Sequence, residues 1–154
     1  MALHLDYNAA TPAGVTTSVP LLIAAIALGG SPAISRNRDE VRVAFDHAPP
    51  NVEGKRMVAV VVNYPPGGSS PPHRHAASAF IYAHVLSGVV RSQVGDEPAK
   101  VYRAGEGFYE MPGSHQRISE NASDKEPASL LAVFVVDSMD DPLTTADPAP
   151  SRSH

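Results

Sequence analysis

The amino-acid sequence predicts an all-β fold, either a sandwich or a barrel. Short runs rich in β-branched and aromatic residues recur along the chain, and turn residues, including 15 prolines, separate them. Such runs, spaced roughly every eight to twelve residues, are typical of all-β architectures. No stretch outside residues 19–28 has a convincing helical period. With 154 residues, the chain is long enough for one domain with a buried core.

Each expected strand follows from its side-chain pattern. Residues 41–45 (VRVAF) alternate between apolar and polar, as a half-buried strand does. Residues 56–64 (RMVAVVVNY) are continuously apolar and β-branched, which is typical of a strand covered on both faces. Gly88 marks a bend between the two runs that follow. In chain order, the strands are expected at residues 41–45, 56–64, 79–88, 89–95, 100–113, 115–119 and 129–137.

The pattern divides the chain into an N-terminal arm at 1–40, a barrel at 41–138 and a polar, proline-rich C-terminal tail at 139–154. Within the arm, residues 19–28 (VPLLIAAIAL) are too apolar to remain exposed, so we expect them at the interface of a homodimer. Ten residues cannot span a bilayer as a helix. The preceding residues contain no Lys or Arg, which argues against a secretion signal and favours a cytoplasmic location.

The composition argues against a nucleic-acid-binding protein and against a metal site made of cysteines. The formal net charge is −4 and no cluster of Lys and Arg occurs, so we expect no nucleic-acid partner. The chain has no cysteine. Any metal ion must therefore be held by imidazole, carboxylate or amide groups, without thiolates.

Two of the seven histidines, His73 and His75, are separated by one residue. In an extended segment, such side chains project from the same face, roughly 6.5 to 7 Å apart along the chain, and two imidazoles can then bind one ion. The H-x-H spacing is weak as a motif by itself. His4, His47 and His154 are interpreted as ordinary surface or core residues.

The surroundings of this pair resemble the first signature motif of the cupin superfamily, the small conical β-barrels of the germin and seed-storage type. That motif has a Gly six positions before H-x-H, then a Glu, and a closing Gly. Gly67, His73, His75 and Gly88 match this order. The Glu of the family should lie seven residues before Gly88, where this chain has Ile81.

The second cupin motif is a Gly, a Pro-Gly turn, a His and a downstream Asn. Gly107, Pro112, Gly113, His115 and Asn121 match this order. The interval from His115 to Asn121 is longer than in the family, which suggests a β-bulge in this strand. The resemblance implies a cupin fold, a jelly-roll barrel of the double-stranded β-helix type.

Carried over to this chain, the resemblance implies a metal site of His73, His75 and His115 that binds one divalent ion, either Fe, Zn, Mn or Ni. The fourth ligand stays open between Gln93, Gln116 and water. His84 is in phase with the side chains that point away from the metal.

Three neutral imidazoles leave the charge of the ion uncancelled, which favours an anionic or chelating small molecule as substrate. With iron, the resemblance favours dioxygenase chemistry. With zinc, manganese or nickel, lyase, isomerase or cyclase chemistry would follow. We expect an enzyme acting on a small carbonyl or carboxylate compound, with dioxygenase chemistry slightly favoured. The alternative is a non-catalytic cupin that binds or senses a small molecule.

Three titratable residues are candidates for a catalytic role beside the metal: Tyr109, Glu110 and His84. For each of them a structural position is the competing interpretation. Tyr109 is expected in the barrel wall, Glu110 at the surface of the Pro-Gly turn, and His84 in the structure or an interface.

Overall fold

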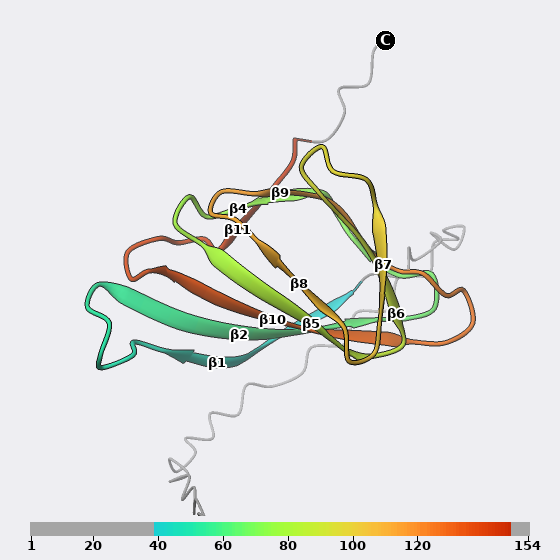
Figure 1. Cartoon of the computed structure of the whole chain (residues 1–154), viewed down its shortest axis with the longest axis horizontal. Coiled ribbons are helices and arrows are strands. Elements are labelled where there is room, and N and C mark those ends of the chain that lie inside the picture. The colour runs from blue at the N-terminus through green and yellow to red at the C-terminus, as the bar shows by residue number, and fades with distance from the viewer. Residues whose placement is uncertain (1–38, 149–154) are drawn as a thin grey trace, which may run out of the picture. The chain divides into compact units, whose positions relative to one another are not determined.

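The computed structural model describes residues 39–148, which form eleven β-strands and no helix (Figure 1). These residues belong to one compact unit. The all-β prediction is confirmed. The apolar run at 19–28, His4 and His154 lie outside the described residues. No helix in the described part of the chain could cross a membrane.

One sheet has five antiparallel strands and supplies most of the apolar core. Val58, Val60 and Val62 alternate with half-buried neighbours along one strand, so that one face of the sheet is buried. In spatial order the strands are β1 (Glu40–His47), β2 (Lys55–Tyr64), β10 (Ala128–Asp137), β5 (Phe80–Ser87) and β8 (Gly107–Glu110).

The second sheet faces the first and buries mainly polar side chains on its inner side (Figure 1). Ser92, Gln116, Ser119 and Asn121 are all buried there. In spatial order the strands are β11 (Thr144–Ala146), β4 (His73–His75), β9 (His115–Asn121), β6 (Val89–Val94) and β7 (Lys100–Arg103), while β3 (Ser69–Ser70) also pairs with β9.

Three expectations about single strands are corrected. All residues of β1 are exposed, although their alternation predicted a half-buried strand, because β1 is an edge strand that pairs only with β2. The far face of β2 is half-buried and not fully covered. The expected strand at 100–113 is divided into β7 and β8, with Gly105 at a φ of +88° in the turn between them.

The C-terminal segment takes part in the sheet as well. β11 lies within the predicted tail and pairs antiparallel with β4, the strand that carries the H-x-H pair. Leu143, Thr144 and Ala146 line the same internal cavity as the histidines. The residues just after the predicted barrel therefore help to enclose its interior.

The expected bulge in β9 is present. Gln93 of β6 is opposite Ile118, but the next residue, Val94, is opposite Gln116, so Arg117 has no partner of its own. One extra residue reverses which side chains face the interior. Before the bulge Gln116 is buried, and after it Ser119 and Asn121 are buried.

Candidate functional site

A cavity of about 340 Å³ lies between the two sheets. Its walls are mainly apolar, with Val60, Ile81, Leu130 and Phe134 contributed by the five-stranded sheet. Val41 and Val43 of the edge strand also line it, and they are 59% and 58% exposed. This volume is at the small end of the range for ligand pockets, about 300–1,000 Å³.

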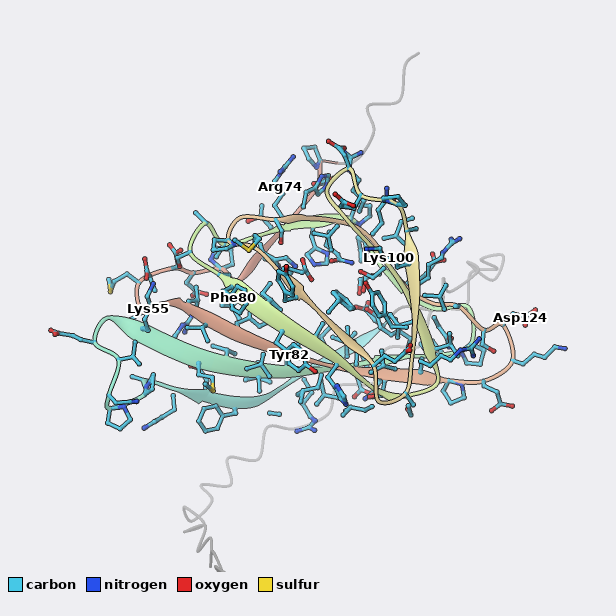
Figure 2. The ribbon with its side chains drawn as sticks, viewed as in Figure 1. Lys55, Arg74, Phe80, Tyr82, Lys100 and Asp124 are labelled. Atoms are coloured by element: carbon cyan, nitrogen blue, oxygen red, sulfur yellow. The ribbon has the colours of Figure 1, made fainter. Side chains whose placement is uncertain are left out.

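His73 and His75 project from β4 into this cavity, as their spacing predicted. Their ring centroids are 4.8 Å apart, and the rings are nearly perpendicular. Arg74, between them, points outward (Figure 2). The His73 Nδ1 atom lies 2.8 Å from the Pro71 carbonyl oxygen, which can only accept, so Nδ1 carries the proton. Burial lowers the pKa of His73, so its ring is neutral at pH 7 and Nε2 keeps a lone pair.

Glu110 is a buried carboxylate in the cavity wall, and this corrects the expected surface position at the turn. It ends β8 and is opposite Ile81 of β5. Its side chain is 5% exposed, and its Oε2 atom lies 3.2 Å from Nε2 of His75, which is equally buried. Ser114 donates a hydrogen bond to the same oxygen at 2.9 Å.

His75 and Glu110 are close without forming a well-directed hydrogen bond. Within residues 39–148, neither ring nitrogen of His75 has a hydrogen-bond partner, although the carboxylate oxygen is within ion-pair distance. Buried polar atoms are almost always satisfied. These unpartnered nitrogens therefore indicate a site for a further group.

Gln116, one of the two proposed fourth ligands, is buried and lines the cavity. Its Nε2 donates to Ser92 Oγ at 2.9 Å and to the Ile118 carbonyl oxygen. With both amide protons engaged, the orientation of the amide is fixed. Its Oε1 atom has no hydrogen-bond partner among the described residues.

The structure does not bring His115 to His73 and His75. His115 is not among the cavity-lining residues, and its Nε2 donates to Asp147 Oδ2 at 2.8 Å. The physical reason is the bulge at Arg117, because the reversed alternation places Gln116 inside and His115 outside. The long interval from His115 to Asn121 is the sequence signal of this reversal.

The remaining candidates lie away from the cavity walls. Gln93 donates to the Glu97 carbonyl oxygen. Tyr109 is 66% exposed, and its ring is 6.0 Å from that of Phe80. His84 shares a 3.2 Å hydrogen bond with Tyr82, whose side chain is exposed (Figure 2).

A hydrogen-bonded chain of hydroxyls, not predicted from the sequence, lines another part of the cavity. The Tyr64 hydroxyl lies 2.7 Å from Ser119 Oγ and 3.1 Å from Ser70 Oγ, and Ser70 donates to Asp39 at 2.5 Å. Burial raises the pKa of Tyr64, so this hydroxyl stays protonated at neutral pH. The chain gives an apolar cavity a second polar region.

The distance between two of these donors is compatible with a shared divalent metal ion. Two atoms that each bind one ion at about 2.1 Å are about 3.0 Å apart at a right angle and about 3.4 Å apart at a tetrahedral angle. The 3.2 Å between Glu110 and His75 lies between these values. Across residues 39–148, however, no group of three or more His, Asp and Glu side chains is arranged to hold a metal ion. The fit therefore rests on this donor pair, the free Nε2 of His73 and the unpartnered amide oxygen of Gln116.

Comparison with solved structures gives the same architecture. An uncharacterized conserved protein with a double-stranded β-helix domain from Klebsiella pneumoniae aligns with a TM-score of 0.55 and 20% identity, over 68% of this chain and 82% of the other. DMSP lyase DddQ from Ruegeria pomeroyi aligns with a TM-score of 0.56 and 17% identity, over 74% and 54%. An oxalate oxidase aligns with a TM-score of 0.53 and 22% identity, over 71% and 59%. At these identities the likeness shows the fold alone.

At the sequence level, no curated protein matches the chain significantly. The family profile described as "Cupin domain" matches residues 60–134, from β2 to β10. This segment contains the H-x-H strand, Glu110 and Gln116. With the two facing sheets described above, the match makes the chain a member of the cupin superfamily.

Proposed function

We propose that this cupin is a metal-dependent enzyme acting on a small carbonyl or carboxylate compound inside the cavity. The observation that carries the proposal is that three possible metal ligands line one mainly apolar cavity: the half-buried His73 and the buried pair His75 and Glu110. Two of the structural neighbours are named for small-molecule reactions, an oxalate oxidase and a DMSP lyase. Oxalate is itself a small carboxylate, which is consistent with the proposed substrate class.

A bound divalent ion would polarise a carbonyl or carboxylate oxygen of the substrate as a Lewis acid. His73 and His75 would hold this ion, and the Pro71 carbonyl would fix the tautomer of His73. The apolar walls would exclude water and strengthen every electrostatic interaction inside. The Tyr64 hydroxyl would accept a hydrogen bond from a polar substrate group, because Ser70 donates its only proton to Asp39 and so receives the proton of Tyr64.

The preference for dioxygenase chemistry depended on a site without a carboxylate. Because Glu110 lies against His75, the site does contain a carboxylate and gives no preference for dioxygenase over lyase, isomerase or cyclase chemistry. The bound metal would decide which of these reaction types the protein catalyses.

The test is turnover by metal-loaded protein. Protein loaded in turn with Fe(II), Mn(II), Ni(II) or Zn(II) is incubated with small carboxylates and diketones. Oxygen consumption and loss of substrate by mass spectrometry are followed. Turnover that requires one metal and disappears in the His73→Ala/His75→Ala double variant supports an enzyme. Absence of turnover with every metal, in protein that binds one of them, contradicts it.

A non-catalytic binding protein is the second candidate function. Two observations favour a binding protein. The cavity wall is mainly apolar, and within residues 39–148 no three His, Asp or Glu side chains are arranged to hold a metal ion. A binding protein would retain a small apolar ligand with unchanged affinity in the double variant. Native mass spectrometry of the wild type and the variant separates these two functions.

We also propose a homodimer. The outer side of β5 and β8 exposes large apolar side chains, among them Phe80, Tyr82, Leu86 and Tyr109. Size-exclusion chromatography with light scattering should give a dimer that Phe80→Lys dissociates. Val101→Lys, at an exposed position of β7, is the matched control that should leave it intact. A monomeric wild type would contradict this.

A further inference from the structure

Glu110 enters the cavity at a position where the first cupin motif of this chain lacks a carboxylate. Ile81 stands where the resemblance places the motif's Glu, and Ile81 and Glu110 are direct partners across β5 and β8. Side chains that are opposite each other in an antiparallel pair start about 4.5–5.5 Å apart at Cβ. Both residues line the cavity. A carboxylate at 110 therefore reaches nearly the same volume as one at 81.

The surroundings of Glu110 do not balance a buried carboxylate. Burying an ionised carboxylate is costly unless a cation and hydrogen bonds compensate. Within the described residues, the only polar side-chain contacts of Glu110 are the Ser114 hydroxyl and the His75 ring. No Lys or Arg of this part of the chain forms an ion pair with it. A bound cation would supply the missing positive charge.

Two residues of the cavity wall carry unpartnered atoms of the kind that a cation needs. His75 Nε2 is 3.2 Å from the carboxylate yet forms no hydrogen bond, and Oε1 of Gln116 is also without a partner in the described chain. Both residues are more than nine-tenths buried, and both line the cavity. Carboxylate, imidazole and amide oxygen are all ligands of divalent metals.

We propose that Glu110 supplies the carboxylate ligand from the strand opposite Ile81, and that Gln116 supplies the donor expected from His115. The inference deepens the proposed function, on which it rests, and assigns a ligand set of His73, His75, Glu110 and Gln116. His115, paired with Asp147, is then outside the set.

The test is a calorimetric titration of metal-free protein with Co²⁺, with the visible absorption of bound Co²⁺ as a second readout of its ligands. Replacing residues that only orient metal ligands typically costs about 10–100-fold in affinity. We therefore expect Glu110→Ala to weaken Co²⁺ binding by about 100-fold or more and to change the absorption spectrum. Gln116→Ala should weaken binding less, because a neutral amide is a weaker ligand than a carboxylate. His115→Ala should bind as the wild type does.

A double variant tests whether the carboxylate can act from either strand. Ile81→Glu combined with Glu110→Ile moves the carboxylate across the strand pair and keeps one Glu and one Ile in the cavity wall. The double variant should recover most of the affinity that Glu110→Ala loses. If Glu110→Ala does not fold, as judged by circular dichroism, this double variant carries the test alone. Folded protein that binds Co²⁺ supports the assignment, and folded protein that does not bind overturns it.

Failure of this inference differs from failure of the proposed function. A wild type that binds no divalent metal overturns both. A wild type that binds Co²⁺, with Glu110→Ala unchanged and His115→Ala weakened, overturns only the assignment of Glu110. The metal site would then consist of His73, His75 and His115.

Discussion

The Tyr64 hydroxyl forms two hydrogen bonds in the cavity wall, and Tyr64→Phe removes this hydroxyl without changing the ring. The side chain is 2% exposed, and its hydroxyl forms hydrogen bonds with Ser119 at 2.7 Å and Ser70 at 3.1 Å. Phenylalanine keeps the ring, so no cavity is created. The variant leaves Ser119 without this partner, whereas Ser70 still bonds to Asp39.

The expected loss can be calculated from these two bonds. A hydrogen bond contributes about 0.5–1.5 kcal/mol net, and a buried partner left unsatisfied raises the loss. Tyr64→Phe should therefore lower the free energy of unfolding by about 1–3 kcal/mol. In urea the midpoint should fall by on the order of 1 M, with an unchanged slope.

Tyr102→Phe is the matched control for this measurement. Tyr102 is half-buried and stacks on Phe108 at 4.6 Å, but its hydroxyl forms no hydrogen bond within the described residues. Its loss should change stability by less than about 0.5 kcal/mol. If Tyr64→Phe is as stable as Tyr102→Phe, the hydroxyl chain does not stabilise the fold and the reasoning is refuted.

Three further outcomes follow from single groups. Burial raises the pKa of Tyr64 in the folded protein above 10.0, so the stability that the protonated hydroxyl contributes is complete below pH 10.0 and is lost as the pH rises through the folded pKa. Urea midpoints should therefore fall more steeply at alkaline pH in the wild type than in Tyr64→Phe. For Asp140 the pH dependence is opposite, because hydrogen bonds from Ser78 lower the pKa of its carboxyl below 3.8. The wild type should be more stable than Asp140→Asn near neutral pH, and this difference in stability should disappear between about pH 5 and about pH 2. A difference that persists at about pH 2 would refute the assignment. Gly88→Ala should destabilise the folded protein by more than about 1 kcal/mol, because φ is +71° and the added Cβ would lie 2.5 Å from the Pro127 carbonyl oxygen. Thermal melts measure this, and a variant as stable as the wild type would contradict it.

The sequence predicted those features that depend on local pattern. The β-branched runs became β2, β5 and β10, and the i, i+2 spacing placed His73 and His75 on one face, because alternation is a property of any extended segment.

Features that depend on pairing with distant strands were not predictable in the same way. A single unpaired residue, Arg117, decides whether His115 or Gln116 faces the interior, and its position depends on register with β6. Glutamate is usually found at the surface, so the sequence predicts an exposed Glu110. Its pairing with Ile81 of a distant strand turns its side chain into the cavity. The length of the His115–Asn121 interval was the one local sign of this reversal.

The central proposal is that the cavity binds one divalent metal ion through His73, His75, Glu110 and Gln116. Anomalous diffraction from crystals grown with Mn²⁺ tests it most directly. The account predicts one strong peak in the cavity, within bonding distance of Nε2 of both histidines and of the Glu110 carboxylate. A peak between His115 and Asp147, or no peak in the cavity at saturating Mn²⁺, would contradict it.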